Sequence, residues 1–215
     1  MHLSTIEFGS LLSYSPRGTS DFEKGSKTYM KALKDDEFIS NPPILMSDFV
    51  AKLINEDIEI LPFSYFFKTN PILVPIPNSS LIRPGTLWVP QRLANALIKQ
   101  ELGSAVVECI KRVKPLPKAA TSLAADRPKA VQHYYSVEIQ KTFSSPKEIL
   151  LVDDIITRGA TILGIANKLS EVFPNSNIRA FAAMRTISPP TVFNSVSESC
   201  IGKITLRGEE TYREP

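Results

Sequence analysis

The sequence predicts an α/β protein with an open, mainly parallel β-sheet flanked by helices. Segments with strand and helix patterns alternate between residues 71 and 184, an order that is typical of parallel strands joined by helical crossovers. In addition, residues 149–152 form an uninterrupted apolar run, which suits a strand covered by helices on both faces of a sheet.

The expected strands and helices follow one another through the last two thirds of the chain. Ser47 is placed to cap a first helix with apolar residues at helical spacing, and an apolar strand at 72–77 ends in prolines, which belong where a strand stops. Pro90 fits the first turn of a second helix, which Gly103 ends. The other expected elements are strands at 106–110, 148–153, 178–184 and 200–206 and a helix at 160–173.

Two regions show no clear period. Residues 1–40 mix polar and aromatic residues with a basic stretch, and residues 111–133 contain three prolines, with five basic side chains between Lys111 and Arg127. We expect the second region to be a long excursion, because loops of that length in compact domains are usually functional or disordered. The expected organisation is an N-terminal extension or hood at 1–45, a core at 46–190, and a C-terminal strand and tail of the same unit at 191–215.

Composition excludes several classes of protein. With 215 residues, of which 43% are hydrophobic, the chain can bury a core without disulfide or metal support. A net charge of +3 is too mild for a dedicated nucleic-acid binder, so nucleic-acid binding is not expected without a partner. Two cysteines and two histidines are too few for a structural zinc site. The cysteine usage and the lack of an apolar stretch of about 18 residues favour a cytoplasmic protein with no membrane association.

The segment ILLVDDIITRGAT is the most informative part of the chain. It reads as a strand, a turn and a helix start, and ligands of open parallel sheets gather beyond the carboxyl ends of strands. Thr157 and Thr161 offer hydroxyls, Gly159 lets backbone amides approach a ligand, and the helix dipole favours an anion there. The turn is therefore predicted to bind phosphate, the simpler alternative being a capping turn.

Two adjacent carboxylates, Asp153 and Asp154, are expected just beyond the strand end. They would repel a phosphate unless they hold hydroxyls or a divalent cation, so the combination favours a phosphorylated sugar. The alternative for these acids is a solvated turn with a helix-capping carboxylate. Neither GxxxxGK[ST] nor GxGxxG occurs, which argues against a nucleoside-triphosphate loop and a dinucleotide site. A phosphoacceptor receiver domain would carry its acid pair after the first strand, and this pair lies in the last third of the chain.

These thirteen residues resemble the phosphoribosyl-diphosphate motif of type I phosphoribosyltransferases, and the wider chain is similar to the ComF-like branch, described as predicted amidophosphoribosyltransferases. Residues 29–38 are similar to that branch's early segment, and residues 74–77 resemble its strand that leads into a diphosphate loop. The resemblance covers residues 29–186, strongly in the motif and loosely elsewhere. It implies the type I phosphoribosyltransferase fold.

The resemblance also implies roles for the matching residues. Asp153 and Asp154 would be the catalytic residues that hold the ribose 2- and 3-hydroxyls, directly or through Mg²⁺. The loop 78–83 would face the diphosphate, and the stretch 112–127 would be a lid over the reacting centre. The residues implied to bind the substrate are Ile155, Ile156, Thr157, Arg158, Gly159, Ala160, Thr161, Pro77, Asn78, Ser79, Arg83 and Arg112.

The expected function is transfer of the phosphoribosyl group from phosphoribosyl diphosphate to a nitrogen acceptor, with Mg²⁺ and release of diphosphate. The alternative is a non-catalytic protein that senses the donor and regulates a partner enzyme or nucleic-acid handling, because fold alone does not decide between them. A homodimer or a partner protein is compatible with either function. Arg83 and Arg112 could contact the ligand or serve surface solubility, and His133 is expected at a loop surface or partner contact.

Overall fold

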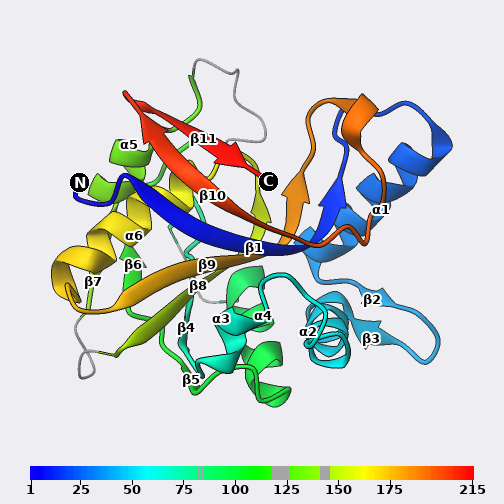
Figure 1. Ribbon diagram of the computed structural model, residues 1–215, viewed down its shortest axis with the longest axis horizontal. Coiled ribbons are helices and arrows are strands. Elements are labelled where there is room, and N and C mark those ends of the chain that lie inside the picture. Colours follow the sequence, from blue (N-terminus) through cyan, green and yellow to red (C-terminus); the bar gives the residue numbers. More distant parts are fainter. Residues whose placement is uncertain (82, 84, 118–125, 141–145) are drawn as a thin grey trace.

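The computed structural model describes the chain except for residues 82, 84, 118–125 and 141–145. The strands of its main sheet are β1 (Thr5–Tyr14), β4 (Ile72–Pro75), β5 (Ala105–Val106), β8 (Glu148–Ile156), β9 (Asn177–Thr186), β10 (Cys200–Arg207) and β11 (Glu210–Glu214). Their order across the sheet is β11-β10-β1-β9-β8-β4-β5 (Figure 1). Four of the neighbouring pairs are parallel and two are antiparallel, so the predicted mainly parallel sheet is confirmed.

The predicted strands are present, with differences at their ends. β8 runs to Ile156, three residues beyond the predicted end, because its pairing with β9 continues to Ile156 and Arg185. The single strand expected at 106–110 is wrong. β5 lies at the edge of the main sheet, and β6 (Ile110–Arg112) pairs with β7 (Val137–Ile139) in a separate two-stranded sheet. The chain therefore leaves the main sheet between β5 and β6.

β1 comes from the region in which the sequence showed no period. It lies between β9 and β10, parallel to β9 and antiparallel to β10 (Figure 1). Seven of its ten residues are buried, and three of these are Gly9, Ser10 and Ser13. These small residues interrupt the apolar pattern that identifies a strand. The beginning of the expected N-terminal extension is thus an interior strand of the sheet, a position that the sequence did not indicate.

Helices cover both faces of the sheet, as predicted. Leu150 of β8 packs in one core cluster with Val50 and Leu97, whereas Leu151 packs in a second cluster with Ile165. Neighbouring strand residues point to opposite faces, so the two clusters lie on opposite sides of β8. The helices are α1 (Asp21–Asp35), α2 (Met46–Glu56), α3 (Tyr65–Lys68), α4 (Val89–Lys99), α5 (Ala130–Tyr135) and α6 (Ala160–Val172). Within the described ranges, none of them is long and apolar enough to cross a membrane.

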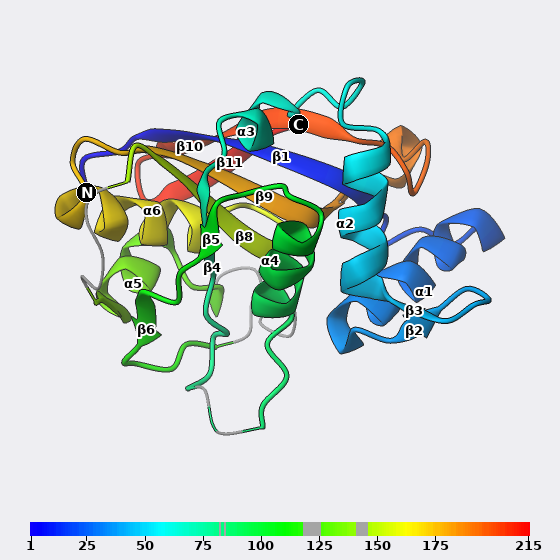
Figure 2. The same ribbon diagram turned by 90° about the horizontal axis from the view of Figure 1, so that it is seen from below.

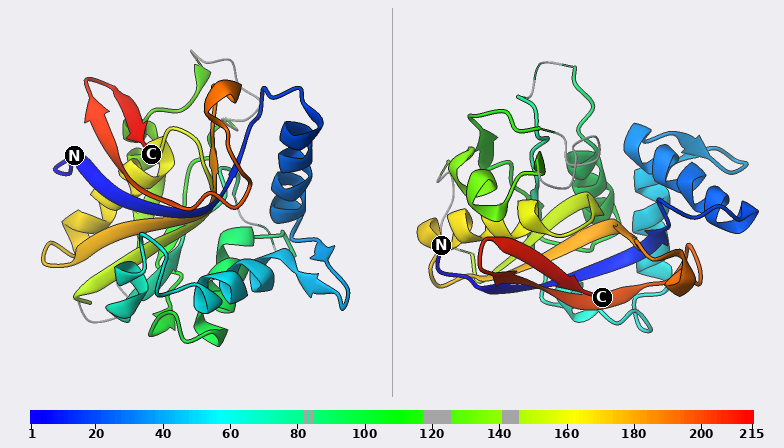
Figure 3. Two further views of the ribbon diagram at one scale, coloured as in Figure 1. Left: turned by 45° about the vertical axis from the view of Figure 1, so that its right-hand side comes forward. Right: turned by 90° about the horizontal axis from the view of Figure 1, so that it is seen from above.

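The N-terminal helix α1 stands apart from the main sheet (Figure 3). Together with the hairpin of β2 (Phe38–Ile39) and β3 (Ile44–Leu45), it lies beside α2 at the end of the molecule opposite α6 (Figure 2). The segment 21–45 is therefore the part of the expected hood that lies outside the main sheet.

The start of α2 differs from the predicted Ser47 cap. The helix begins at Met46, and Leu45 before it makes no side-chain cap. Instead, the N–H of Ser47 donates to Oδ1 of the buried Asp36, 2.9 Å away, and Arg92 of α4 donates to Oδ2 of the same carboxylate at 3.0 Å. A negative charge at a helix N-terminus is stabilising. Asp36 thus takes the capping role and connects α1, α2 and α4.

The carboxyl ends of β1, β4, β8 and β9 reach the same edge of the sheet, because these strands are parallel. Along the sheet, the chain moves from β4 to β5 in one direction and from β8 to β9 in the other. The switch falls between β4 and β8. Ligands of open parallel sheets bind at such an edge. A ligand site is therefore expected at the residues that end or follow these strands.

Candidate functional site

A cavity of about 260 Å³ opens at the carboxyl ends of β1, β8 and β9. The predicted motif forms much of its wall, since Asp153 and every residue from Ile155 to Thr161 line it. The other lining residues are Tyr14, Pro16, Arg17, Arg127, Pro128, His133, Ile162, Thr186 and Ser188. We call it the motif cavity. The structure therefore brings most of the predicted motif residues together around one space.

The N-terminus of α6 faces the motif cavity. Gly159 precedes the helix with φ of +81°, and as a glycine it gives the first turn no side-chain cap. The first N–H groups of a helix have no partner within the helix, and they favour an anion together with the helix dipole. Ala160, Thr161 and Ile162, which carry three of these groups, all line the cavity. This geometry suits the predicted phosphate contact.

Gly159 is required at its position for two reasons. A positive φ is unfavourable for residues that carry a Cβ atom. A Cβ at Gly159 would also lie within 2.6–2.7 Å of three side-chain atoms of Ile204, and Ile204 is fully buried in β10. The turn can therefore approach the hairpin of β10 and β11 only if its residue 159 has no side chain.

The acid pair lies inside β8 rather than beyond its end, which corrects the prediction. Asp153 and Asp154 are followed by two more residues of the strand. The N–H of Asp154 donates to Oδ1 of Asp153 at 2.9 Å, and the N–H of Ile155 donates to Oδ1 of Asp154 at 2.7 Å. Successive strand residues alternate between faces, and only Asp153 of the pair lines the motif cavity. The two carboxylates therefore do not contribute equally.

Asp153 has a strongly perturbed ionisation. Burial raises its pKa well above the ordinary value, and the neighbouring Asp154 carboxylate raises it further. The hydrogen bond from the N–H of Asp154 and the charge of Lys34 act in the opposite direction. A carboxyl group with such a pKa is typical of functional sites, although buried structural pairs show it as well.

Arg112 is neither a ligand-facing nor a surface residue. It is 4% exposed, and its Nε and Nη2 donate to the backbone oxygens of Asn78 and Pro77 at 3.0 and 3.3 Å. Its Nη1 donates to the Ser136 hydroxyl. Burial lowers its pKa to about 10, an effect that the charge of Asp153 opposes. Arg112 thus holds the backbone at the start of the predicted diphosphate loop through the oxygens of Pro77 and Asn78.

His133 is also not at the surface, contrary to expectation. It lies in α5, is 5% exposed and lines the motif cavity. Its Nε2 is 3.3 Å from the hydroxyl of Thr161, and its Nδ1 is buried without a hydrogen-bond partner. Burial lowers the pKa of His133 to about 3, and the positive charge of the nearby Arg112 also lowers it. A neutral imidazole therefore supports the hydroxyl at the start of α6.

The side chains of the turn itself point in different directions. The hydroxyls of Thr157 and Thr186 are 3.2 Å apart across the ends of β8 and β9. Arg158 donates from Nη1 to Glu210 of β11 at 3.1 Å. The guanidinium of Arg158 is therefore already paired with the hairpin of β10 and β11.

The predicted diphosphate loop lies outside the motif cavity. Pro77, Asn78, Ser79 and Arg83 follow β4 but do not line it. The Asn78 amide donates to the Leu87 oxygen at 3.1 Å, which closes the loop on itself. Arg83 is exposed. Of the predicted lid at 112–127, residues 118–125 lie outside the described residues, while Arg127 lines the cavity.

Several lining residues were missed by sequence reasoning. Tyr14 ends β1 and is followed by Pro16 and Arg17, and Thr186 ends β9 and is followed by Ser188. Recognition of β1 as a parallel strand would have placed its exit beside the motif. The signal was absent because small polar residues interrupt that strand.

The acid pair is suited to Mg²⁺ in part. Mg²⁺ is commonly held by one or two carboxylates while water and substrate oxygens complete its shell. A cation between Asp153 and Asp154 would relieve the repulsion that raises the Asp153 pKa. Among the described residues, no group of three or more His, Cys, Asp or Glu side chains could hold a metal. Among the described residues, the acid pair would therefore be the carboxylate ligands of such a cation.

Comparison with known proteins adds no relative to this description. Neither a scan of protein-family models nor a search of curated proteins gives a match for the chain.

Proposed function

We propose that this protein binds phosphoribosyl diphosphate with Mg²⁺ and transfers the phosphoribosyl group to a nitrogen acceptor, releasing diphosphate. One observation carries the proposal: the carboxyl of Asp153 and the N-terminus of α6 line the same cavity. A hydroxyl-binding acid and an anion-binding helix start on one cavity suit the two kinds of polar group that a pentose 5-phosphate carries. The type I phosphoribosyltransferase fold is part of the same proposal.

The 5-phosphate would bind to the backbone N–H groups of residues 160–162 and to the hydroxyls of Thr157 and Thr161. Backbone donors hold an anion without adding a mobile charge. His133 would keep the Thr161 hydroxyl in place, because its Nε2 lies 3.3 Å from that oxygen and the ring stays neutral. The cavity volume of about 260 Å³ suits a pentose phosphate better than a dinucleotide.

The ribose hydroxyls would donate hydrogen bonds to Asp153 and Asp154. Donors to a carboxylate favour its ionised form, so sugar binding would lower the pKa of Asp153 from its raised value. Mg²⁺, when bound, would supply electrostatic stabilisation of the charge on the leaving diphosphate. Arg17 and Arg127 line the same cavity and add positive charge there.

In the reaction, the acceptor nitrogen forms a bond to the anomeric carbon while the bond from that carbon to the diphosphate oxygen breaks. The electron pair of the broken bond leaves on diphosphate, and the nitrogen loses its proton. The chain needs no covalent nucleophile for this displacement. Its residues hold the pentose at both ends and fix the direction of attack.

Calorimetric titration with phosphoribosyl diphosphate, with and without Mg²⁺, tests donor binding. The double variant Asp153→Asn with Asp154→Asn should reduce affinity at least 100-fold, about 3 kcal/mol. The matched control is Glu56→Gln with Asp57→Asn, two adjacent exposed acids at the end of α2. Wild-type affinity in the Asp153 and Asp154 variant would overturn the site.

Diphosphate release tests turnover. The donor is offered with purines, pyrimidines, and ammonia or glutamine as nitrogen acceptors, and release is measured for each. Release with one acceptor supports the transferase. Tight, Mg²⁺-dependent donor binding with no release for any acceptor supports the alternative, a protein that senses the donor.

A further inference from the structure

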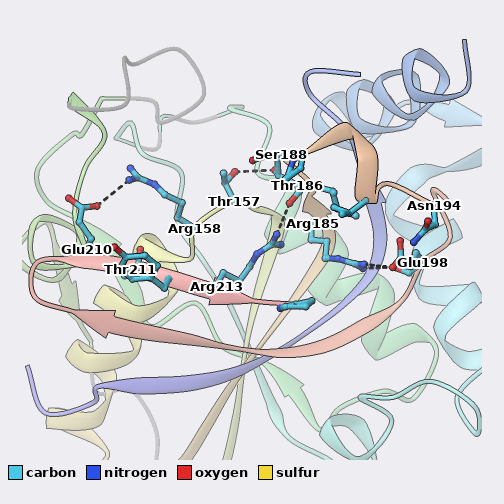
Figure 4. Close-up of a pocket in the computed structure, with 15 residues that line it drawn as sticks. Thr157, Arg158, Arg185, Thr186, Ser188, Asn194, Glu198, Glu210, Thr211 and Arg213 are labelled. Atoms are coloured by element: carbon cyan, nitrogen blue, oxygen red, sulfur yellow. Dashed lines mark hydrogen bonds and ion pairs between the residues drawn. The ribbon is translucent and has the colours of Figure 1, made fainter. Parts of the chain in front are cut away.

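A second and larger cavity, of about 890 Å³, lies between the carboxyl end of β9 and the hairpin of β10 and β11. We call it the hairpin cavity. Figure 4 shows its walls, with Arg158 and Arg213 on one side and Arg185 beside Glu198 on the other. It shares Thr157, Arg158, Thr186 and Ser188 with the motif cavity. Its volume is in the range of small-molecule sites.

The charged side chains of the hairpin cavity are not balanced. Three arginines and two glutamates line it. Arg158 pairs with Glu210 at 3.1 Å, and the buried Arg185 pairs with Glu198 at 3.1 Å. Arg213 forms no ion pair with any carboxylate of the described residues, within 4.0 Å. One positive charge of the wall is thus left without a counter-charge.

The guanidinium of Arg213 is also short of hydrogen bonds. Its Nη2 donates to the Thr186 oxygen at 2.5 Å, but its Nε and Nη1 are buried without a partner. The group lies over the ring of Phe8, 5.7 Å from the ring centre. Burial lowers its pKa to about 10, and the charge of Arg185 lowers it further, with Cys200 opposing. Buried charges are normally paired or hydrogen-bonded. Because Nε and Nη1 are closed off from the cavity, an anion there would supply the missing counter-charge rather than partners for these two atoms.

Apolar side chains line the same cavity. Val192 is 54% exposed and Tyr212 is 48% exposed, and both line the cavity together with Ile187. Large exposed apolar side chains beside a converging polar group are typical of small-molecule sites. Such a wall would accept the body of a ligand, while the guanidinium would bind its charged group.

We propose that the hairpin cavity binds a small molecule with a flat apolar body and one oxyanion, held by Arg213. The oxyanion is a carboxylate or a phosphate, since a guanidinium binds both. This site adjoins the pentose site proposed above, but Arg213 lines only the hairpin cavity, so the proposal does not depend on pentose binding.

Paired probes of equal shape test the proposal. Benzoate and benzamide share a flat ring and differ in charge, and phenyl phosphate distinguishes a phosphate from a carboxylate. Affinities are measured by titration calorimetry or by NMR at constant ionic strength. We expect the wild-type protein to bind benzoate or phenyl phosphate at least tenfold more tightly than benzamide, and the tighter of the two anions identifies the oxyanion.

Two variants of basic residues locate the binding. Arg213→Gln should reduce the preference for the anion to less than about twofold. Lys203→Gln is the control, because Lys203 is an exposed cation of the same hairpin and does not line the cavity. It should leave the preference unchanged. The Asp153→Asn and Asp154→Asn variant should lose the donor but still bind the anion, which separates this site from the pentose site.

Equal affinity of wild-type protein for benzoate and benzamide would overturn the proposal. An anion preference that survives in Arg213→Gln would overturn it as well. If that variant does not fold, Tyr212→Ala gives a second measurement. This variant should weaken the binding of benzoate and of benzamide by the same factor. An unchanged affinity for both would mean that the probes bind outside the hairpin cavity.

Discussion

The motif cavity and the hairpin cavity meet at Thr157 and Arg158 but are built in different ways. Much of the motif cavity comes from one continuous segment, residues 153–162, with the exits of neighbouring strands around it. The hairpin cavity is assembled from three stretches, 157–158, 185–198 and 210–215. A continuous segment leaves a recognisable pattern in a sequence, whereas an assembled site leaves none until the sheet order is known.

The two cavities also differ in the charged group that has a shifted pKa in their walls. The motif cavity has Asp153 at its floor, with burial raising the pKa of that carboxyl. The hairpin cavity has Arg213, with burial lowering the pKa of the guanidinium to about 10. In each case the surroundings disfavour the charged form of the group. Opposite charges suggest opposite ligands, sugar hydroxyls with a cation in the first and an oxyanion in the second.

The largest expected effect is the pH dependence caused by His133 in the wall of the motif cavity. The unfolded chain takes up a proton at an ordinary pKa of 6.5, whereas burial keeps the folded imidazole neutral to about 3. The unfolded state therefore binds more protons between these values, and the free energy of unfolding falls as the pH drops from 6.5 to 3. The loss from this residue is about 4 kcal/mol.

Urea unfolding of wild-type protein and of His133→Gln across that pH range checks this effect. The variant should lose less stability as the pH falls. His2→Gln, at an exposed residue outside both cavities, is the control and should follow the wild type. If His133→Gln has the wild-type pH profile, the ring is not held neutral against the hydroxyl of Thr161.

A smaller effect is expected at Gly159, the point where the motif turn touches the hairpin. Gly159→Ala should reduce the free energy of unfolding by roughly 2–4 kcal/mol, because it combines a strained φ with a contact against Ile204. Gly208→Ala also has a positive φ, but nothing lies within 4 Å of its added Cβ, so it should cost about 1 kcal/mol. Equal losses in the two variants would mean that Ile204 moves aside freely.

The sequence predicted the motif turn well because the geometry of that turn is local. Gly159, the helix that follows it and the acids before it are set by spacing within one segment, and the structure brings them around one cavity. The end of β8 was misjudged, since strand length depends on pairing with β9 rather than on the acids themselves. Charged residues at a sheet edge can continue a strand when the neighbouring strand continues.

The sequence could not predict the residues that depend on tertiary packing. Gly9 of β1 is required because a Cβ there would lie 2.6 Å from Cγ of Phe63, far along the chain. The hydroxyls of Ser10 and Ser13 are buried because they donate to the oxygens of Leu12 and Ser195. Such contacts remove the apolar alternation that identifies a strand. The burial of Arg112 and His133 follows from the same kind of long-range packing.

The next effect concerns Asp153 and has the opposite sign to that of His133. The unfolded chain ionises this group near 3.8, whereas the folded protein holds the proton to a higher pH. The free energy of unfolding therefore falls as the pH rises above 3.8, by up to about 1.4 kcal/mol per pH unit. Asp153→Asn should remove this component, as followed by urea unfolding.

The neighbouring acid separates the two causes of the Asp153 shift. Burial is the larger cause and the charge of Asp154 the smaller, so Asp154→Asn should reduce the pH dependence without abolishing it. Asp57→Asn, at an exposed residue that ends α2, is the control and should leave the dependence intact. Complete loss of the dependence in Asp154→Asn would make the like charge, and not burial, its main origin.

The smallest effect is expected where the two cavities meet, at the ion pair of Arg158 and Glu210. Their side chains are 35% and 44% exposed, with 3.1 Å between Nη1 and Oε2, and pairs with this exposure contribute about 0.2–1 kcal/mol. A double-mutant cycle with Arg158→Gln and Glu210→Gln should give a coupling in that range that weakens with added salt. Lys129 remains paired with Glu209 at 2.6 Å in each variant, so the hairpin should stay in place. A coupling above about 2 kcal/mol would instead mean that this pair binds the motif turn to the hairpin, and that the two cavities cannot be changed independently.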